Sequence, residues 1–396
     1  MRRATRWLAV ALAALAACKG PEAPPPEERI VLEPVAFADL DGWQDDDQAA
    51  ALAAFLESCS WFAGQDPARA IGRDGMAGTA ADWQAACQAA ALVPPGDGTA
   101  ARAFFEDRFT PYAASDGADD QGLFTGYYEP LLRGARERTD AFTVPLYGRP
   151  PDLVTVDLGR FDEMLAGRTV AGRVEEGALV PYHERKAIVE GALAGRGLEV
   201  AWVDSAVDAF FLQIQGSGQV ALPDGGRLRL GYAAANGRSY LAIGKVLVER
   251  GEIPKDKVSL QTIKAWLLAH PDQADEVMDQ NRSYVFFREL TGPGPVGAQG
   301  VPLTPGRSLA VDRRFVALGT PVWLDILVPG PDEASPDEAM RRLVVAQDTG
   351  GAIKGPVRAD LFWGAGAEAE SRAGRMKHPG RYVLLLPRGV AVAAAD

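Results

Sequence analysis

The stretch VVAQDTGGAIKGPVRADLFWG, residues 344–364, combines a strand pattern with the side chains of a reactive site. Its apolar start predicts a strand that ends at Asp348, and two glycines then permit a tight turn or a close approach to a ligand. Asp360 follows twelve residues later, beside the aromatic pair Phe362 and Trp363. A carboxylic acid near apolar rings has a raised pKa and can donate a proton at neutral pH. Aromatic faces beside such an acid also suit sugar rings.

This stretch alone leaves other interpretations open. Asp-Thr-Gly is common turn chemistry, so Asp348 could simply form a turn. An apolar run followed by Asp-Thr-Gly is also typical of one lobe of an aspartic peptidase, which needs two carboxylates that share a proton. The chain contains no second Asp-Thr-Gly or Asp-Ser-Gly, so a peptidase would have to be a homodimer.

Length and composition narrow the class of protein. The 396 residues predict two or three domains, and a hydrophobic fraction of 47% with 24% charged residues is ordinary for a globular protein. A net charge of −12 argues against binding to nucleic acid and against electrostatic attraction to anionic lipid. The 3 histidines are scattered singly, so we expect no metal site and no cofactor. Acid–base chemistry should therefore fall to Asp or Glu.

The N-terminus carries the features of an export signal. Three arginines precede an apolar run, Leu8–Ala17, which is too short to be a transmembrane helix. The run ends in Leu-Ala-Ala-Cys, which resembles a bacterial lipobox, so we expect a signal peptide over residues 1–17 and a lipidated Cys18. Lys19 is compatible with sorting to the outer membrane of a Gram-negative bacterium. Residues 18–29 would form a proline-rich tether. The alternative is an ordinary signal peptide with an incidental cysteine.

The rest of the chain predicts a helical N-terminal region followed by short strands and further helices. We expect N-terminal helices over Trp43–Phe62, Ala80–Leu92 and Thr99–Phe109, with a possible Cys59–Cys87 disulfide in an oxidising compartment. Further helices are predicted over Tyr182–Ala194, Ser239–Arg250, Leu260–His270, from Pro271 and over Ala365–Met376. Strands are predicted over Gly122–Pro130, Phe142–Tyr147, Ala209–Gly218, Arg227–Tyr232, Tyr284–Phe287, Ser308–Asp312, Pro321–Ile326, Arg342–Gln347 and Tyr382–Leu386. Short strands between Gly/Pro loops indicate a small closed barrel.

Six segments occur in a characteristic order: FTGYYEP, QIQGSG, GYAAANGRSYLAIG, NRSYVFF, GVPLTPGRSLAVD and QDTGGAIKGPVRADLFWG. Together they resemble the membrane-bound lytic murein transglycosylase A family over about Phe124–Leu386, and the C-terminal part resembles the three-aspartate domain. The resemblance implies a mixed α+β fold, mainly β. A double-psi β-barrel would be built from residues 30–125, which include the N-terminal helices, and 281–388, with a β-rich insert at 126–280, a groove between them and a tail at 389–396.

The resemblance also implies an activity. The family cleaves the β-1,4 bond between N-acetylmuramic acid and N-acetylglucosamine in peptidoglycan without water, leaving 1,6-anhydromuramoyl ends during cell-wall turnover. Asp360 would be the catalytic acid, with Asp348 and Asp312 in supporting positions. The expected substrate-binding residues are Thr125, Tyr128, Gln213, Gln215, Ser217, Asn236, Tyr284, Lys354 and Trp363.

The expected partners are peptidoglycan glycan strands and a membrane reached through the lipid anchor, with cell-wall synthesis proteins as further candidates. We expect a monomer that faces the periplasm. Two other functions stay open from sequence. One is a hydrolytic muramidase on the same scaffold, and the other is a peptidoglycan-binding lipoprotein without catalytic activity.

Overall fold

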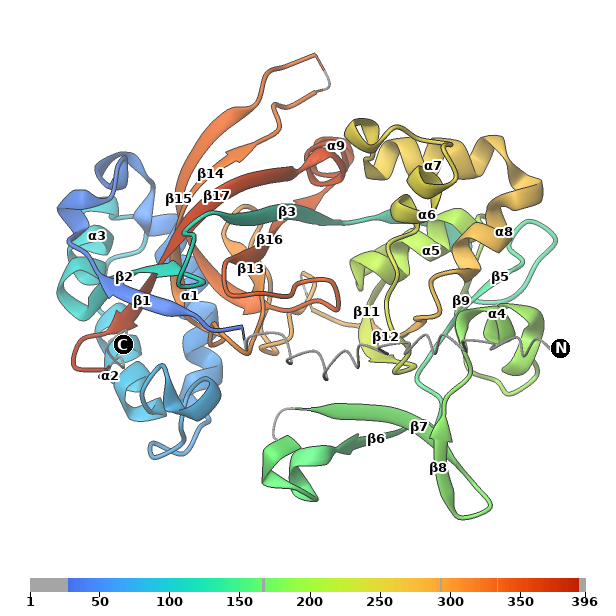
Figure 1. Ribbon diagram of the computed structural model, residues 1–396, viewed down its shortest axis with the longest axis horizontal. Coiled ribbons are helices and arrows are strands. Elements are labelled where there is room, and N and C mark those ends of the chain that lie inside the picture. The colour runs from blue at the N-terminus through green and yellow to red at the C-terminus, as the bar shows by residue number, and fades with distance from the viewer. Residues whose placement is uncertain (1–27, 166–167, 293, 333, 392–396) are drawn as a thin grey trace, which may run out of the picture.

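A computed structural model describes residues 28–165, 168–292, 294–332 and 334–391, so the predicted signal peptide and Cys18 lie outside the described residues. The fold is mixed α/β, mainly β, and it contains a closed six-stranded barrel (Figure 1). In order round the ring the strands are β3 (Gly122–Glu129), β17 (Lys377–Pro387), β14 (Pro321–Val328), β15 (Glu338–Asp348), β13 (Ser308–Val311) and β16 (Arg358–Ala365). The strands predicted from sequence in these regions are confirmed.

Strand β3 belongs to the barrel although most of the barrel comes from the C-terminal part of the chain. It pairs in parallel with β16 and antiparallel with β17, and this second pairing closes the ring. Gly122 at its start allows a close approach, because a Cβ there would lie 1.8 Å from the carbonyl oxygen of Val357. The edge of β17 also pairs with β2 (Phe109–Ser115), which pairs with β1 (Val31–Pro34).

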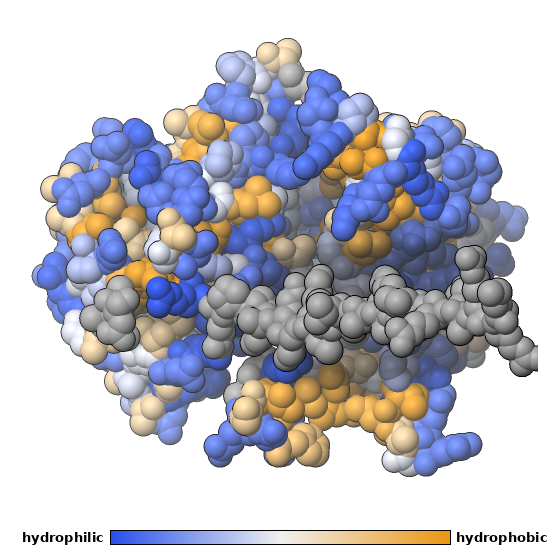
Figure 2. Space-filling view, in the orientation of Figure 1, coloured by the Kyte–Doolittle hydropathy of each residue, from blue (hydrophilic) through white to orange (hydrophobic). Residues whose placement is uncertain are grey.

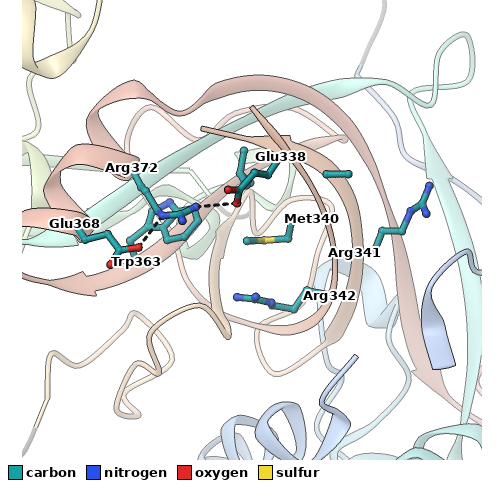
Figure 3. A pocket seen from close by; sticks show the side chains of 9 residues that line it. Glu338, Met340, Arg341, Arg342, Trp363, Glu368 and Arg372 are labelled. Atoms are coloured by element: carbon teal, nitrogen blue, oxygen red, sulfur yellow. Dashed lines mark hydrogen bonds and ion pairs between the residues drawn. The ribbon is translucent and has the colours of Figure 1, made fainter. Parts of the chain in front are cut away.

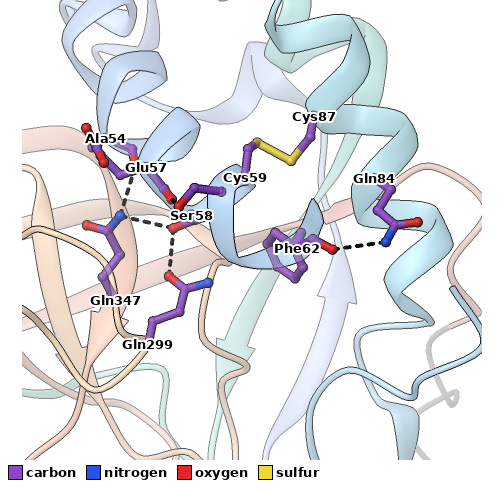
Figure 4. The surroundings of a disulfide bond; sticks show 10 residues. Ala54, Glu57, Ser58, Cys59, Phe62, Gln84, Cys87, Gln299 and Gln347 are labelled. Atoms are coloured by element: carbon purple, nitrogen blue, oxygen red, sulfur yellow. Dashed lines mark hydrogen bonds between the residues drawn. A yellow bond between two sulfur atoms is a disulfide. The ribbon is translucent and has the colours of Figure 1, made fainter. Parts of the chain in front are cut away.

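Three helices cover one side of the barrel, at the left of Figure 1. They are α1 (Gln48–Ala63), α2 (Ala80–Ala90) and α3 (Gly98–Arg108). Aromatic side chains from these helices, including Phe55, Trp83 and Phe105, belong to one hydrophobic core with residues of the barrel strands. Cys59 in α1 and Cys87 in α2 form a disulfide (Figure 4).

A buried polar contact also holds α1 to the barrel. The Gln347 Nε2 amide donates to the Ala54 carbonyl oxygen at 2.8 Å and to Ser58 Oγ at 3.0 Å (Figure 4). Ser58 Oγ in turn donates to Gln299 Oε1 at 2.7 Å. Since buried polar groups without partners are costly, this network favours one placement of the helix on the barrel.

The first helix begins later than the sequence predicts. Asp47 caps α1, its side chain accepting from the Ala50 N–H, whereas Asp46 leaves the helix to pair with Arg307 at 2.8 Å. Both members of this pair are almost fully buried. Of these neighbouring acidic residues, one therefore caps the helix and another forms a tertiary ion pair. The local sequence does not show which residue takes which role.

The chain between β3 and β13 forms an insert with its own sheet, at the right of Figure 1. The strand order is β12 (Val285–Leu290), β11 (Arg227–Ala235), β10 (Gly218–Ala221), β4 (Leu131–Ala135), β9 (Glu199–Val203) and β5 (Val144–Tyr147). Its helices are α4 (Arg185–Ala187, continued by a π turn at Ile188–Ala192), α5 (Ala206–Gln215), α6 (Ile243–Glu249), α7 (Leu260–Ala269) and α8 (Pro271–Asp279). Helix α9 (Ala367–Arg375) follows β16. Strand β5 contains Pro145 and lies at the sheet edge, where a strand tolerates proline.

The predicted strand Ala209–Gly218 is wrong, because α5 occupies this part of the chain. Val207, Phe210, Phe211 and Ile214 follow helical spacing and pack together in the insert core. Ser205 Oγ caps the start by accepting from the Asp208 N–H, and the helix ends at Gly216 with φ 79°. The residues of this segment that alternate between apolar and polar fit a strand as well as a helix. The apolar residues outside that short window favour the helix.

A three-stranded sheet projects from the insert as an arm, at the bottom of Figure 1. It consists of β6 (Val154–Asp157), β7 (Thr169–Glu175) and β8 (Ala178–Pro181), in a region where the sequence predicted no strand. The register places Val154, Val156, Val170, Val174, Leu179 and Pro181 on one face. Val174 is 60% exposed, and hydrophobic residues gather over the arm in Figure 2.

Candidate active site

Four residues form a row across four neighbouring barrel strands. Asp348 in β15 pairs with Ala310 in β13, Ala310 pairs with Asp360 in β16, and Asp360 pairs with Thr125 in β3. Directly paired residues point to the same face of a sheet, so both carboxylates flank the small Ala310 side chain. With strands about 4.8 Å apart, the two aspartate backbones lie roughly 10 Å from each other. The barrel thus brings Asp348, Asp360 and Thr125 together, as the sequence predicts.

Asp360 is partly buried and has one direct hydrogen-bond donor among the described side chains. Thr125 Oγ1 donates to Asp360 Oδ1 at 2.8 Å, and Arg358 Nη2 donates to Thr125 Oγ1 at 2.8 Å. Burial raises the pKa of Asp360 to about 6, against the lowering effects of the Arg358 charge and the Thr125 hydrogen bond, and the Asp348 charge raises it further. Asp360 is therefore an acid whose two protonation states are both accessible near neutral pH.

The apolar surroundings of this face come from Tyr127, Leu303, Ala310, Ile353 and Phe362, which form one cluster. The rings of Tyr127 and Phe362 lie 5.1 Å apart, and each residue is two positions beyond Thr125 or Asp360 on its strand. Phe362 is therefore on the same side of the sheet as the acid, as the sequence predicts for the aromatic pair.

Trp363 lies on the opposite face of β16 and is not brought to Asp360. Its Nε1 approaches Met376 Sδ at 3.3 Å, and the Arg372 guanidinium lies 5.2 Å from its ring. Trp363 and Arg372 line a cavity of about 380 Å³ beside α9, together with Glu338 and Arg342 (Figure 3). Asp360 does not line this cavity, so the aromatic platform predicted from Trp363 belongs to another part of the molecule.

Asp348 has hydrogen-bond donors at both carboxylate oxygens. The N–H groups of Ala298 and Thr349 donate to Oδ1 at 2.9 Å each, and the Tyr127 hydroxyl donates to Oδ2 at 3.0 Å. Burial raises the pKa of Asp348, although these hydrogen bonds act in the other direction. Asp348 thus binds Tyr127 and the loop at Ala298 next to the row of paired residues that contains Asp360.

Asp312 lies just after β13 and is almost fully buried. Arg314 pairs with it at 2.7 Å, and the Gly355 N–H donates to Oδ2 at 3.0 Å. Burial would raise the pKa of Asp312, but the Arg314 side chain and the Gly355 and Arg314 N–H groups outweigh it and hold the pKa below its ordinary value. Asp312 is an ionised clamp for the loop between β15 and β16.

The residues predicted for sugar binding in the insert are mostly engaged in holding the fold. Asn236 is fully buried and donates to the carbonyl oxygens of His183 and Arg282 at 2.9 Å. Gln213 and Tyr284 are buried and lie beside each other. Ser217 is also buried.

Two more predicted binding residues join the insert to the barrel. Gln215 Oε1 accepts from the Tyr128 N–H at 3.0 Å, which ties the end of α5 to β3. The Tyr128 side chain is buried against Ala369 and Ala373 of α9, on the face of β3 opposite Thr125. The structure therefore places neither side chain beside Asp360.

Lys354 is exposed, in the loop before β16. It lines a cavity of about 360 Å³ together with Leu123, Val357 and Arg358. Arg358 is two residues before Asp360, so this cavity lies near the start of β16. Of the predicted binding residues in the C-terminal region, Lys354 is the one that the structure places beside this open space.

Sequence reasoning missed Tyr240, which comes from the insert between β11 and α6. Burial raises the pKa of its phenol, and the charge of Asp360 raises it further, so the two side chains are electrostatically coupled. Tyr240 is 38% exposed, which leaves part of its ring available to a ligand. The signal was present in GYAAANGRSYLAIG, where a tyrosine follows Arg-Ser in a polar turn.

Within the described ranges, no group of three or more His, Cys, Asp or Glu side chains could hold a metal ion. In the same part of the chain, no helix combines the length and the apolar character that crossing a bilayer requires.

Comparisons with known proteins agree with this architecture. Residues 123–288 match the MltA specific insert domain, and residues 307–386 match the 3D domain. The membrane-bound lytic murein transglycosylase A of Vibrio cholerae serotype O1 is 35% identical over 270 residues, which are 67% of this chain and 66% of that relative.

Two solved structures are also similar. The crystal structure of a membrane-bound lytic murein transglycosylase from Agrobacterium tumefaciens has 37% sequence identity and a TM-score of 0.80, covering 90% of this chain and 98% of that one. A crystal structure of Escherichia coli MltA with bound chitohexaose has 29% identity and a TM-score of 0.61, covering 91% and 94%.

Proposed function

This chain belongs to the membrane-bound lytic murein transglycosylase A family, and we propose that it cleaves peptidoglycan strands without water. The bond broken is the β-1,4 link between N-acetylmuramic acid and N-acetylglucosamine, and the product carries a 1,6-anhydromuramoyl end. The observation that carries the proposal is Asp360, a partly buried acid with a pKa of about 6 and a single hydroxyl donor on one oxygen.

One carboxyl group can serve both halves of this reaction. Protonated Asp360 gives its proton to the glycosidic oxygen as the C1–O bond breaks, which releases the N-acetylglucosamine side as an alcohol. The resulting carboxylate then takes the proton of the muramic 6-hydroxyl as that oxygen bonds to C1. Because the nucleophile belongs to the same sugar, its effective concentration can reach the order of 10⁵ M or more.

The state of Asp348 supports transglycosylation over hydrolysis. A hydrolase needs a second carboxylate to activate water or to attack the sugar. Both oxygens of Asp348 already accept hydrogen bonds from Ala298, Thr349 and Tyr127. Asp348 is therefore poorly placed to act as a base or nucleophile, and a muramidase on this scaffold is the weaker hypothesis.

The glycan would lie in a groove between the barrel and the insert. Asp360 comes from the barrel and Tyr240 from the insert, and the electrostatic coupling between them supports a site formed by both parts. Chitohexaose, bound by one relative, is an oligomer of β-1,4-linked N-acetylglucosamine and thus chemically similar to the proposed strand. We also assign the barrel a double-psi connectivity, with residues 30–125 and 281–388 enclosing the insert at 126–280.

The test is the digestion of purified sacculi followed by mass spectrometry of the soluble products. Wild-type protein should release anhydro-muropeptides, and Asp360→Asn should lose about 10²- to 10⁴-fold in rate while staying folded. Asp272→Asn, at an exposed aspartate in α8, is the matched control and should keep full activity. Products heavier by one water would indicate a muramidase, and binding without products would indicate a non-catalytic lipoprotein.

We place the mature protein at the periplasmic face of the outer membrane, as a monomer anchored through Cys18, with cell-wall synthesis proteins as candidate partners. The lipobox-like Leu-Ala-Ala-Cys and the tether to residue 29 support this location. Cell fractionation with palmitate labelling tests it. The wild-type protein should be labelled and membrane-bound, and a labelled Cys18→Ser variant would contradict the anchor.

A further inference from the structure

We propose that Arg358 and Thr125 form a hydrogen-bond relay that determines which oxygen of Asp360 carries the transferable proton. The inference rests on the proposed function, because it assumes that Asp360 is the acid. Thr125 is then a positioning residue for Asp360, in place of the sugar-binding residue that the sequence suggested.

The direction of the relay follows from the chemistry of its members. A guanidinium has donors and no acceptor, so the contact between Arg358 Nη2 and Thr125 Oγ1 at 2.8 Å occupies a lone pair of the hydroxyl. The single hydroxyl proton of Thr125 is then available for Asp360 Oδ1, which lies 2.8 Å away. Since Oδ1 already faces a proton, protonation of the carboxyl group falls on Oδ2.

Backbone pairing fixes the three side chains in this order. Thr125 and Asp360 are directly paired in parallel strands, and Arg358 is paired with Leu123 two positions earlier. The guanidinium is also held by the backbone, because Nη1 donates to the carbonyl oxygens of Leu123 and Ala359. Arg358 is therefore anchored to both strands while it orients the hydroxyl.

The arrangement makes Oδ2 the working oxygen in both steps. It delivers its proton to the glycosidic oxygen, and later receives the proton of the 6-hydroxyl, while Oδ1 keeps its hydrogen bond from Thr125. The catalytic group does not have to rotate between the two halves of the reaction, because the donor to Oδ1 is the same in the acid and in the carboxylate.

The relay also limits how strongly the proton is held. Burial raises the pKa of Asp360 to about 6, and the Arg358 charge and the Thr125 hydrogen bond oppose that rise. The other titratable groups that face Asp360 are Asp348 from β15, Tyr127 from β3 and Tyr240 from the insert. None of these donates a hydrogen bond to Oδ1 among the described contacts, so loss of the Thr125 hydroxyl should raise the pKa.

The test is Thr125→Val, which keeps the shape of the side chain and removes the hydroxyl. Carbon-13 NMR titration of the Asp360 carboxyl should give a pKa higher by about one unit, the size expected for a lost hydrogen bond to a charged group. The falling limb of the pH profile of kcat/KM should move to higher pH by the same amount, and kcat should drop several-fold at its maximum.

Three further variants separate the relay from a general structural effect. Thr125→Ser restores a hydroxyl and should return both the pKa and kcat towards wild type. Arg358→Met removes the orienting donor and the positive charge, and should raise the pKa as well. Thr155→Val, at an exposed threonine in β6 of the arm, is the matched control and should change neither quantity.

The outcomes distinguish the relay from the proposed function. An unchanged carboxyl pKa in folded Thr125→Val would overturn the relay, whatever the activity of the protein. A raised pKa together with no anhydro products from the wild-type protein would instead overturn the function and leave the hydrogen-bond assignment standing.

Discussion

Asp360 and Asp312 lie close to each other in the barrel topology, one within β16 and the other just after its neighbour β13, yet their surroundings differ. Asp360 receives one hydroxyl hydrogen bond on Oδ1, and burial raises its pKa to about 6. Asp312 receives donors on both oxygens from Arg314 and one from Gly355, and its pKa is held below the ordinary value despite burial. The first is the proposed proton donor, and the second is held in its ionised form.

The comparison shows that burial alone does not decide the protonation state of a carboxyl group. Only 3% of the surface of Asp312 is exposed, but its donors from Arg314 and Gly355 outweigh the desolvation of its charge and keep it ionised. Asp360 has few donors, so the cost of desolvating its charge prevails. The donors around Asp312 and the stronger desolvation of Asp360 together explain why the two pKa values shift in opposite directions.

The largest difference should appear when each aspartate is replaced by asparagine. In Asp312→Asn the new amide group must face Arg314 or the Gly355 N–H, which are both donors, so the free energy of unfolding should fall by about 2–3 kcal/mol. In Asp360→Asn the amide can take the place of Oδ2, which has no donor among the described contacts, and stability should not fall. Urea denaturation measures both, and equal losses would show that the two sites are alike.

A smaller effect should appear in the pH dependence of stability. The folded pKa of Asp360 is raised, so its contribution is complete below the unfolded value near 3.8 and is lost as pH rises through about 6. Wild-type stability relative to Asp360→Asn should thus fall by roughly 2 kcal/mol between pH 4 and pH 7.

Asp312 should show the opposite sign, because its folded pKa is lowered. Its contribution is present above the ordinary value and disappears as pH falls through the folded value. Wild-type stability relative to Asp312→Asn should therefore be constant at neutral pH and should shrink below about pH 4. Melting curves at several pH values measure how the stability difference between wild type and each variant changes with pH. If that difference changed in the same direction for both variants, the assignment would be contradicted.

The smallest effect concerns Asp348, whose charge raises the pKa of Asp360. Asp348→Asn removes that charge, so the falling limb of the pH–activity profile should move to lower pH by less than one unit. Tyr127→Phe keeps the Asp348 charge and serves as the control for the lost hydrogen bond. A shift to higher pH in Asp348→Asn would show that the two carboxyl groups interact through something other than charge.

Local patterns predicted much of the barrel correctly. The strands around Ser308, Pro321, Arg342 and Tyr382 were predicted because each is a short apolar run between Gly/Pro turns. Helices α7 and α8 were both predicted, the second from Pro271 at its start, and the structure shows that Ser259 caps α7. These signals are local, so no tertiary information was needed.

The errors lie where a short window fits two structures. The alternation in Ala209–Gly218 predicted a strand, but Val207, Phe210, Phe211 and Ile214 complete a helical face that packs in the insert core. In the arm, polar and glycine residues interrupt the alternation of valines in β6 and β7, and the sequence predicted no strand there. In both places, contacts with other segments select the structure.

The sequence itself determined the set of candidate residues, with Asp360 as the acid. Residue types and the order of motifs can be read without knowing the structure. Tertiary structure alone decided which of those residues meet. The register between β3 and β16 brings Thr125 to Asp360 across 235 positions of the chain. Successive residues of a strand point to opposite faces of the sheet, so Phe362 lies on the face of Asp360 and Trp363 on the other face. Only the long-range pairing of β16 decides which of these two faces meets which part of the molecule.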